Sequence, residues 1–188
     1  NEGDFLTVFG PNGSGKTTLL NIIAKVENPT NGSIRYARPN LRVSYVFQNY
    51  DESLLPWRTV EKNINLPFEN HKFQQVNARE KLERVIKLLK LGPYLDKYPY
   101  MLSGGKKQLT ALARALVVEP DLLIMDEPFS SLDFDTTIEM EQLVMEIWET
   151  LHMTILFVSH NIAEAILLAN KVIILSHRPS IIRKIVDV

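Results

Sequence analysis

The sequence predicts an α/β fold in which helices flank a mainly parallel sheet, with a helical subdomain inserted into it. Three observations support this prediction. Short apolar strands alternate with longer helices, a glycine-rich turn joins the first strand to the first helix, and the alternation stops between residues 51 and 100. With 188 residues, 45% of them hydrophobic, the chain is long enough to bury the core of such a domain.

The pattern opens with a strand, a glycine-rich turn, a helix and a second strand. The predicted bounds are 5–9 for the first strand, 16–26 for the helix and 43–47 for the second strand. Between the helix and the second strand, residues 28–32 read Asn-Pro-Thr-Asn-Gly, which favours a turn.

The segment at 51–100 differs, because it carries four prolines, few strand signals and one amphipathic helix. In that helix Leu82, Val85, Ile86 and Leu89 recur at helical spacing. We therefore predict a helical subdomain. Its predicted bounds are 51–118, and those of the α/β core are 1–50 and 119–188.

After this segment the α/β pattern resumes. The predicted elements are a helix at 106–118, a strand at 122–125, a helix at 136–151, a strand at 154–158, a short helix after His160 and a strand at 172–175. The run at 122–125 is continuously apolar, which suits a strand buried on both faces of a parallel sheet.

Composition excludes several classes of protein. A net charge of −1 gives no basic field for nucleic acid, and the absence of cysteine excludes disulfides and thiolate metal sites. No apolar run approaches the ~18–20 residues that span a bilayer, and no signal peptide is visible. We expect a domain of cytosolic type. Because the chain starts at Asn1 and enters a strand almost at once, we also expect preceding residues to be missing.

The turn between the first strand and helix carries the strongest motif, G-x-x-x-x-G-K-T. Its glycines let successive backbone N–H groups point at phosphate oxygens, with a helix N-terminus behind them. Lys16 would place a charge at the β- and γ-phosphates, and the Thr17 hydroxyl would bind Mg²⁺. The motif predicts a P-loop NTPase that binds ATP. The predicted contact residues are Gly10, Pro11, Asn12, Gly13, Ser14, Gly15, Lys16, Thr17 and Thr18.

Two carboxylates follow the apolar strand at 122–125. Ligands bind at the carboxyl ends of such strands, so Asp126 is placed to hold Mg²⁺ through water. Glu127 is placed to orient or deprotonate an attacking water. Taken alone, such a pair more often marks loop solvation or helix capping. Beside a phosphate loop it predicts hydrolysis.

Leu-Ser-Gly-Gly at residues 102–105 precedes the helix that leads into the carboxylate strand. Alone, Ser103 is equally well explained as an N-cap. Together with the other two motifs, the segment resembles the signature of the ATP-binding cassette (ABC) family. The resemblance covers essentially the whole chain: Gln48 is similar to the family's glutamine loop, residues 130–133 to its D-loop and His160 to its switch histidine.

The resemblance implies a head-to-tail dimer in which each ATP lies between one phosphate loop and the partner's signature. Ser103 and Gly105 would then serve the nucleotide of the other ATPase domain, and Gly104 and Asp133 are further predicted cofactor-binding residues. A helix N-terminus with glycine amides suits an anion, so this role is physically sound. Hydrolysis would weaken the dimer and so produce motion.

Several of these residues have two readings. Gln48 is a ligand toward Mg²⁺ or water, or a solvated loop residue. His160 is a hydrogen-bond donor to the γ-phosphate, or a helix cap. Asp133 caps the following helix, and a role across the dimer is equally open. Trp57 is either subdomain core or an exposed contact for a partner helix. The predicted catalytic residues are Glu127, His160 and Gln48, and the predicted metal ligands are Thr17, Gln48 and Asp126.

The sequence departs from the family pattern at two points. Lys106 stands where the family commonly has glutamine, and we do not carry that glutamine's function over to it. The family also stacks adenine on an aromatic residue upstream of the phosphate loop, and only nine residues precede Gly10. Phe5 and Phe9 are expected to be core strand residues, so no adenine contact is assigned.

Residues 54–60 and the turn at 176–180 are similar to the nitrate, sulfonate and taurine importer branch. The resemblance implies an ATPase subunit at the cytoplasmic face of the cell membrane that powers import of a small anionic solute. Its partners would be separate membrane-spanning permease subunits and, through them, a solute-binding protein.

Two classes of alternative remain. One is an ABC-type ATPase of DNA repair or chromosome maintenance, or another non-transport ABC ATPase. The DNA-linked members usually insert long coiled coils between glutamine loop and signature. Only 54 residues separate Gln48 from Ser103, without sustained heptads, so we expect no nucleic-acid partner. The other is a non-hydrolysing nucleotide-gated module, but this class would lack the carboxylate that Glu127 supplies.

Overall fold

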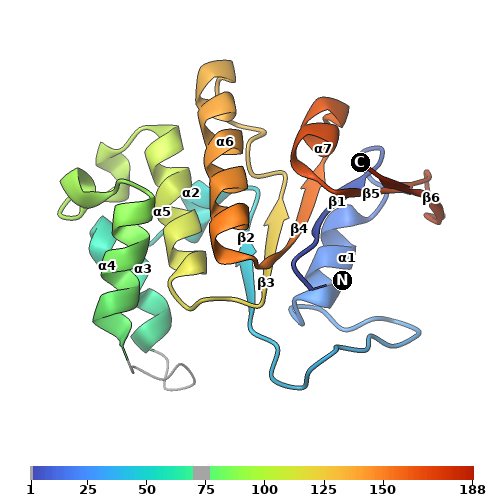
Figure 1. Ribbon diagram of the computed structural model, residues 1–188, viewed down its shortest axis with the longest axis horizontal. Coiled ribbons are helices and arrows are strands. Elements are labelled where there is room, and N and C mark those ends of the chain that lie inside the picture. Colours follow the sequence, from blue (N-terminus) through green and yellow to red (C-terminus); the bar gives the residue numbers. More distant parts are fainter. Residues whose placement is uncertain (1, 70–76) are drawn as a thin grey trace. The chain divides into compact units, whose positions relative to one another are not determined.

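The computed structural model describes residues 2–69 and 77–188 and confirms the α/β fold (Figure 1). Within them one sheet has the strand order β2-β3-β4-β1-β5-β6. The strands are β1 (Phe5–Phe9), β2 (Val43–Val46), β3 (Leu122–Asp126), β4 (Thr154–Ser159), β5 (Lys171–Leu175) and β6 (Ile182–Asp187). β1 pairs in parallel with β4 and β5, and β3 pairs in parallel with β4. The sheet is therefore mainly parallel, as predicted.

Strand β6 lies outside the predicted pattern and runs antiparallel to β5. It forms an edge of the sheet, and all its side chains except that of Val186 are exposed. An exposed edge strand buries no continuous face, so the alternation of apolar and polar residues that signals a strand does not develop there.

The predicted helices occur in the predicted order with shifted ends, and the two short helices at 50–53 and 60–65 were not predicted individually. The helices are α1 (Lys16–Ile23), α2 (Tyr50–Ser53), α3 (Val60–Asn65), α4 (Ala78–Leu88), α5 (Gly104–Leu116), α6 (Phe134–Leu151) and α7 (Ile162–Leu168). Single 3₁₀ turns lie at η1 (Leu66–Glu69), η2 (Gly92–Tyr94) and η3 (Pro99–Met101). Within the described part of the chain, none of these helices combines the length and the apolar character needed to cross a membrane.

Four predicted helix ends were wrong. Helix α5 stops at Leu116 instead of residue 118, and α6 begins at Phe134 instead of residue 136. Helix α1 stops at Ile23, not at residue 26, because Lys25 adopts a left-handed backbone conformation with φ 61° that an α-helix cannot continue. Helix α5 begins at Gly104, two residues before the predicted start, because the extended backbone of Ser103 turns directly into the helix.

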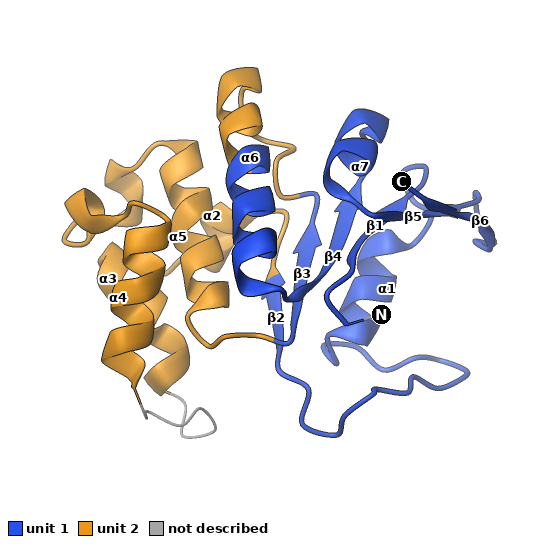
Figure 2. Ribbon diagram, viewed as in Figure 1, with its two compact units in different colours: residues 1–45, 121–127, 141–188 blue, residues 46–120, 128–140 orange. Residues whose placement is uncertain are grey.

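The chain forms two compact units (Figure 2). Unit 1 comprises residues 1–45, 121–127 and 141–188, and unit 2 comprises 46–120 and 128–140. Unit 1 has an apolar core of Val8, Leu20, Ile124, Leu156, Val158 and Leu175. In unit 2, Tyr50, Leu54 and Ala111 form a buried cluster with Leu132 packed against it. The domain bounds predicted from the sequence stay a prediction.

Candidate active site

The phosphate loop, residues 10–17, joins the carboxyl end of β1 to the start of α1. Gly13 and Gly15 have φ angles of 75° and 91°, in the left-handed region that side chains disfavour. Gly15 occupies the N-cap position of α1. The first N–H groups of a helix lack intrahelical partners, so this loop and the helix start together present backbone donors to an anion.

The Lys16 side chain lies at the centre of this loop. It is 6% exposed, and its Nζ donates to the carbonyl oxygens of Gly10 at 3.0 Å and Pro11 at 3.2 Å. The same nitrogen lies 3.8 Å from Oε1 of Glu127. A buried positive charge therefore faces both the loop backbone and the carboxylate that follows β3.

Asp126 ends strand β3 and is 3% exposed. Its Oδ2 accepts a hydrogen bond from the Tyr45 hydroxyl at 3.2 Å, and its carboxylate is also hydrogen-bonded to the Thr17 side chain. Burial raises the pKa of Asp126 above its usual value, while these two hydrogen bonds act in the opposite direction. Burial, followed by the charge of Asp126, raises the pKa of Tyr45, which keeps its phenol protonated as a donor.

The surroundings of Asp126 fit a hydrated magnesium ion. Its Oδ1 is buried and has no hydrogen-bond partner within the described residues, so a charged oxygen is left for a cation or its water. Thr17 adds a hydroxyl oxygen beside it. No group of three or more His, Asp or Glu side chains gathers in the described ranges to form an all-protein metal cage. Mg²⁺ usually keeps several waters and takes few protein ligands, so this sparse oxygen set is suitable.

Glu127 and His160 face each other beside the phosphate loop. The Glu127 Oε2 lies 3.0 Å from Nδ1 of His160, and the Glu127 N–H donates to the carbonyl of Val158 at 3.0 Å. Glu127 has φ 43°, which is uncommon outside glycine and is typical of side chains constrained at functional sites. The carboxylate is thus fixed between a lysine and an imidazole.

The helix-cap reading of His160 is wrong. Helix α7 is capped by Asn161, whose side chain accepts a hydrogen bond from the N–H of Ala163 at 2.9 Å. His160 points instead to Glu127 and is 53% exposed. Its role as a partner of the reacting phosphate stays a prediction.

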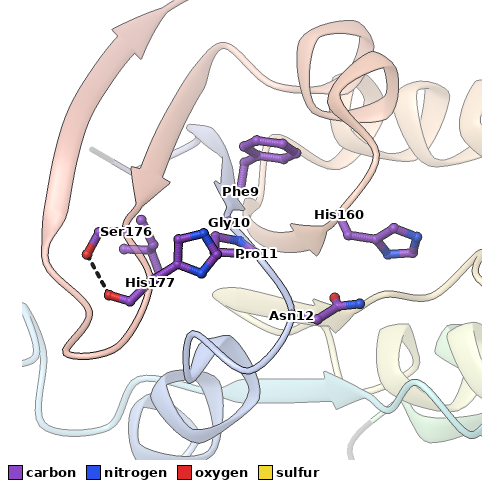
Figure 3. A pocket seen from close by; sticks show the side chains of 8 residues that line it. Phe9, Gly10, Pro11, Asn12, His160, Ser176 and His177 are labelled. Carbon is purple, nitrogen blue, oxygen red and sulfur yellow. Dashed lines mark hydrogen bonds between the residues drawn. The ribbon is translucent and has the colours of Figure 1, made fainter.

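A cavity of about 390 Å³ opens beside the phosphate loop (Figure 3). Its lining residues are Phe9, Gly10, Pro11, Asn12, His160, Leu175, Ser176 and His177. Phe5 is fully buried, as expected of a core residue, but Phe9 is only partly buried and lines this cavity. The expectation that both phenylalanines belong to the core was therefore wrong for Phe9, since the carboxyl end of β1 opens onto the site.

In unit 2, Ser103 takes the N-cap position of α5. Its backbone is extended, yet its hydroxyl makes no capping hydrogen bond, and the residue is exposed. Ser103 therefore occupies the N-cap position, as predicted, but its side chain does not cap the helix. An uncommitted hydroxyl stands at the N-terminus of a 13-residue helix.

The two signature glycines lie close to neighbouring side chains. A Cβ on Gly104 would lie 2.9 Å from the Tyr50 hydroxyl, and one on Gly105 would lie 2.7 Å from Cγ2 of Thr136. Both separations are shorter than ordinary van der Waals contact. Gly104 and Gly105 are thus closely packed within their own unit, whereas Ser103 is exposed.

Three contacts attach the short helix α2 to α5. Tyr50 lies against Gly104, Lys107 forms an ion pair with Asp51 at 2.7 Å, and Arg114 donates to Ser53. The Arg114 bonds reach the Ser53 carbonyl at 2.6 Å and its hydroxyl at 3.0 Å. Gln48, which is exposed, lies two residues before α2. Helix α2, which follows Gln48, is therefore linked to α5 at points from Gly104 to Arg114.

Asp133, Trp57 and Lys106 also lie in unit 2, where a role of Asp133 across the dimer stays a prediction. Asp133 caps the following helix, accepting from the Thr136 N–H at 2.9 Å and its hydroxyl at 2.8 Å, and these bonds lower the pKa of Asp133. Trp57 is 71% exposed, so the core reading was wrong. Lys106 lies over the ring of Tyr94, 5.3 Å from its centroid.

Unit 1 therefore brings together the phosphate loop, Asp126, Glu127 and His160, whereas the signature glycines, Gln48 and Asp133 belong to unit 2. No sequence pattern points to Tyr45, because its role depends on pairing between β2 and β3, which lie far apart in the chain.

Residues 1–130 match the family model described as ABC transporter. The chain belongs to this family. The ABC ATPase binds and hydrolyses ATP as a subunit of a transporter, so the enzymatic prediction from the phosphate loop and carboxylates is confirmed.

Named relatives agree with the importer resemblance. The chain is 37% identical over 191 residues to the aliphatic sulfonates import ATP-binding protein SsuB of Bacillus cereus, covering 99% of this chain and 74% of that protein. It is 40% identical over 185 residues to the nitrate import ATP-binding protein NrtC of Synechococcus elongatus, covering 95% of this chain and 28% of that protein.

A similar solved structure is a dimeric ATP-binding cassette in a post-hydrolysis state bound to ADP and phosphate. It superposes with a TM-score of 0.77 at 28% identity and covers 98% of this chain and 87% of that one. The DNA-repair alternative finds no support among these relatives.

Proposed function

We propose that this ABC ATPase hydrolyses Mg-ATP as a head-to-tail dimer and powers import of a small anionic solute such as nitrate, sulfonate or taurine. The observation that carries the catalytic part is the position of Glu127, 3.0 Å from His160 and 3.8 Å from Lys16. The sulfonate and nitrate import relatives support the class of solute.

Binding begins at the phosphate loop. The backbone N–H groups and the N-terminus of α1 take the phosphate oxygens, and Lys16 exchanges its bonds to the Gly10 and Pro11 carbonyls for bonds to phosphate. The exchange costs little, because the ammonium is already desolvated and positioned within the loop.

Magnesium would be held by the Thr17 hydroxyl and by the unpaired Oδ1 of Asp126 acting through water. When bound, it supplies positive charge that offsets the negative charge of the β- and γ-phosphates. Tyr45 keeps the other Asp126 oxygen occupied and so fixes the orientation of the carboxylate. Gln48 would add a further contact to the ion or the attacking water.

Glu127 is the proposed general base. The oxygen of a water attacks the γ-phosphorus, the bond from phosphorus to the ADP oxygen breaks, and the water proton passes to the Glu127 carboxylate. His160 orients this carboxylate and would donate to the γ-phosphate.

The second half of the site comes from another copy. The exposed Ser103 hydroxyl and the N-terminus of α5, with Gly104 and Gly105, are suited to the γ-phosphate held by the partner's phosphate loop. Asp133 would lie at the same dimer interface.

Trp57 marks the proposed permease contact. Its exposed ring follows α2, and aromatic residues are enriched at protein interfaces. A cytoplasmic helix of the permease seated here would bring the subunit to the cytoplasmic face of the membrane, with a solute-binding protein acting through the permease.

The catalytic test is Glu127→Gln, with Glu149→Gln, an exposed carboxylate on α6, as the control. We expect Glu127→Gln to bind ATP normally, to lose turnover by roughly 10²- to 10⁴-fold, and to accumulate an ATP-bound dimer in sizing experiments. Normal hydrolysis by this variant would show that another group is the base.

The transport test is purification of the full-length protein with its membrane partner, followed by ATP-dependent uptake in vesicles. Nitrate, an alkanesulfonate and taurine are compared with a cationic amino acid as the control. Uptake of the cation alone, or ATPase stimulation by DNA rather than by the permease, would contradict the proposed function.

A further inference from the structure

The turn between β5 and β6 lies against the phosphate loop. The Ser180 hydroxyl donates to the backbone carbonyl of Ser14 at 2.5 Å, although the two residues are 166 positions apart in the sequence. The same hydroxyl lies 3.1 Å from the Ser176 carbonyl. A hydroxyl has one hydrogen, and the shorter contact is the stronger bond, so the proton lies on the Ser14 side.

The Ser14 carbonyl shares its peptide group with the N–H of Gly15. In a trans peptide the C=O and the N–H point in opposite directions, so holding the carbonyl on one side of the loop directs the N–H to the other. Gly15 has φ 91° and stands at the N-cap of α1, where alternative backbone orientations are accessible to glycine. A hydrogen bond at this peptide therefore selects one orientation.

The turn is itself well fixed. The Ser176 N–H donates to the Ile181 carbonyl at 3.0 Å, and the Ile181 N–H donates to the Ser176 hydroxyl at 3.0 Å. At its start, Leu175 lies so close to Gly10 that an added Cβ on that glycine would be 3.0 Å from the Leu175 Cβ. Both ends of the turn thus anchor Ser180 over the loop.

We propose that Ser180 is a positioning residue for phosphate binding, whose hydroxyl holds the Ser14–Gly15 peptide so that the Gly15 N–H points at a nucleotide phosphate. The inference rests on the nucleotide site described above and goes beyond it, because Ser180 ends the turn that resembles the importer branch but has no role assigned by that resemblance. Ser180 acts through the peptide and touches no reacting atom.

The test compares two variants of equal shape, Ser180→Thr and Ser180→Val, of which only the first keeps a hydroxyl. ATP and ADP affinities are measured by titration, and KM and kcat by steady-state hydrolysis. One neutral hydrogen bond corresponds to a change of about 3- to 10-fold. We expect Ser180→Val to bind both nucleotides about 3- to 10-fold more weakly than Ser180→Thr, with KM raised by the same factor and kcat within about two-fold.

Thermal unfolding without nucleotide separates positioning from folding. The two variants should unfold at the same temperature, and Ser33→Ala, an exposed serine distant in the chain, should match the wild type in every assay. Equal affinities for the Thr and Val variants would overturn the role of Ser180. So would a lower kcat with an unchanged KM, or a melting temperature that falls only in the Val variant. Failure of the wild type to bind ATP would instead overturn the nucleotide site, and the role of Ser180 with it.

Discussion

The phosphate loop and the signature segment both place glycines at the N-terminus of a helix, but for different physical reasons. In the phosphate loop, Gly13 and Gly15 have positive φ angles, and an added Cβ would meet nothing within 4 Å. In the signature segment, Gly104 and Gly105 lie outside the left-handed region, and an added Cβ would be 2.9 Å or less from a neighbouring side chain. One segment needs glycine for conformation and the other for space.

The largest effect on nucleotide affinity should follow the loss of the charge that completes the phosphate loop. Lys16→Ala removes a buried, charged donor, for which hydrogen bonds are worth about 1.5–3 kcal/mol. We expect ATP affinity to fall by roughly 10- to 150-fold in a titration, while Lys87→Ala on α4 has no effect. Unchanged affinity would show that the loop binds phosphate through its backbone alone.

A second substitution should restore stability where glycine is needed for space and should not restore it where glycine is needed for backbone conformation. Gly105→Ala should destabilise the protein by about 1–3 kcal/mol, because its Cβ would overlap Cγ2 of Thr136. Adding Thr136→Ser removes that methyl but keeps the hydroxyl bonded to Asp133, so thermal unfolding should recover.

Gly15→Ala has no such rescue, because its cost of about 1–2 kcal/mol lies in the backbone. Recovery of Gly15→Ala by any side-chain truncation nearby, or no recovery of Gly105→Ala with Thr136→Ser, would break the distinction.

The Ser103 hydroxyl should matter for turnover more than for binding. Ser103→Ala leaves the phosphate loop of its own chain intact, so ATP affinity of the monomer should stay within about two-fold, while kcat falls by about 3- to 10-fold. In mixed dimers with one wild-type copy, the defect should appear at the site formed by the wild-type phosphate loop. A defect confined to the mutant chain's own nucleotide would contradict the shared site.

The smallest effect should be a change in melting temperature when the buried carboxylate of Asp126 is replaced. Burial raises the pKa of Asp126, so the folded state binds its proton more tightly than the unfolded state. The contribution of this group to the free energy of unfolding is therefore fully present below the unfolded pKa and is lost as pH rises through the folded pKa. We expect Asp126→Asn to raise the melting temperature at pH 7.5 by about 2–4 °C, as ~1 kcal/mol does in a domain of this size, and less at pH 4.

Asp121→Asn supplies the control of opposite sign. The backbone N–H of Arg42 donates to Asp121 at 2.8 Å and lowers the pKa of that carboxyl, so its contribution is present above the unfolded pKa and lost as pH falls. This variant should melt at a lower temperature at pH 7.5. A loss of stability in Asp126→Asn at neutral pH would show that its hydrogen bonds outweigh its burial.

The sequence predicted those features that depend on neighbours in the chain. The phosphate loop, the strand that ends in Asp126 and the cap formed by Asp133 are local patterns, and the structure has them at the predicted places. The end of α1 was missed because Lys25 adopts a conformation that its residue type does not announce.

Contacts between distant segments could not be predicted in this way. Three contacts depend on the fold to bring their elements together. They are the hydrogen bonds from Ser180 to Ser14 and from Tyr45 to Asp126, and the close approach of Thr136 to Gly105. A serine in a turn, a tyrosine in a strand and a threonine in a first helical turn are ordinary residues by type. Only their neighbours in the folded chain give them a structural role.

The three attachments between α2 and α5 have a mechanical consequence. Helix α5 has 13 residues, or about 20 Å of rigid rod, and α2 contacts it near its start through Tyr50 and near its end through Ser53. Because α2 is attached near both ends of α5, we expect a displacement of α2 to move the whole helix. The Ser103 hydroxyl at its N-terminus would then move with α2.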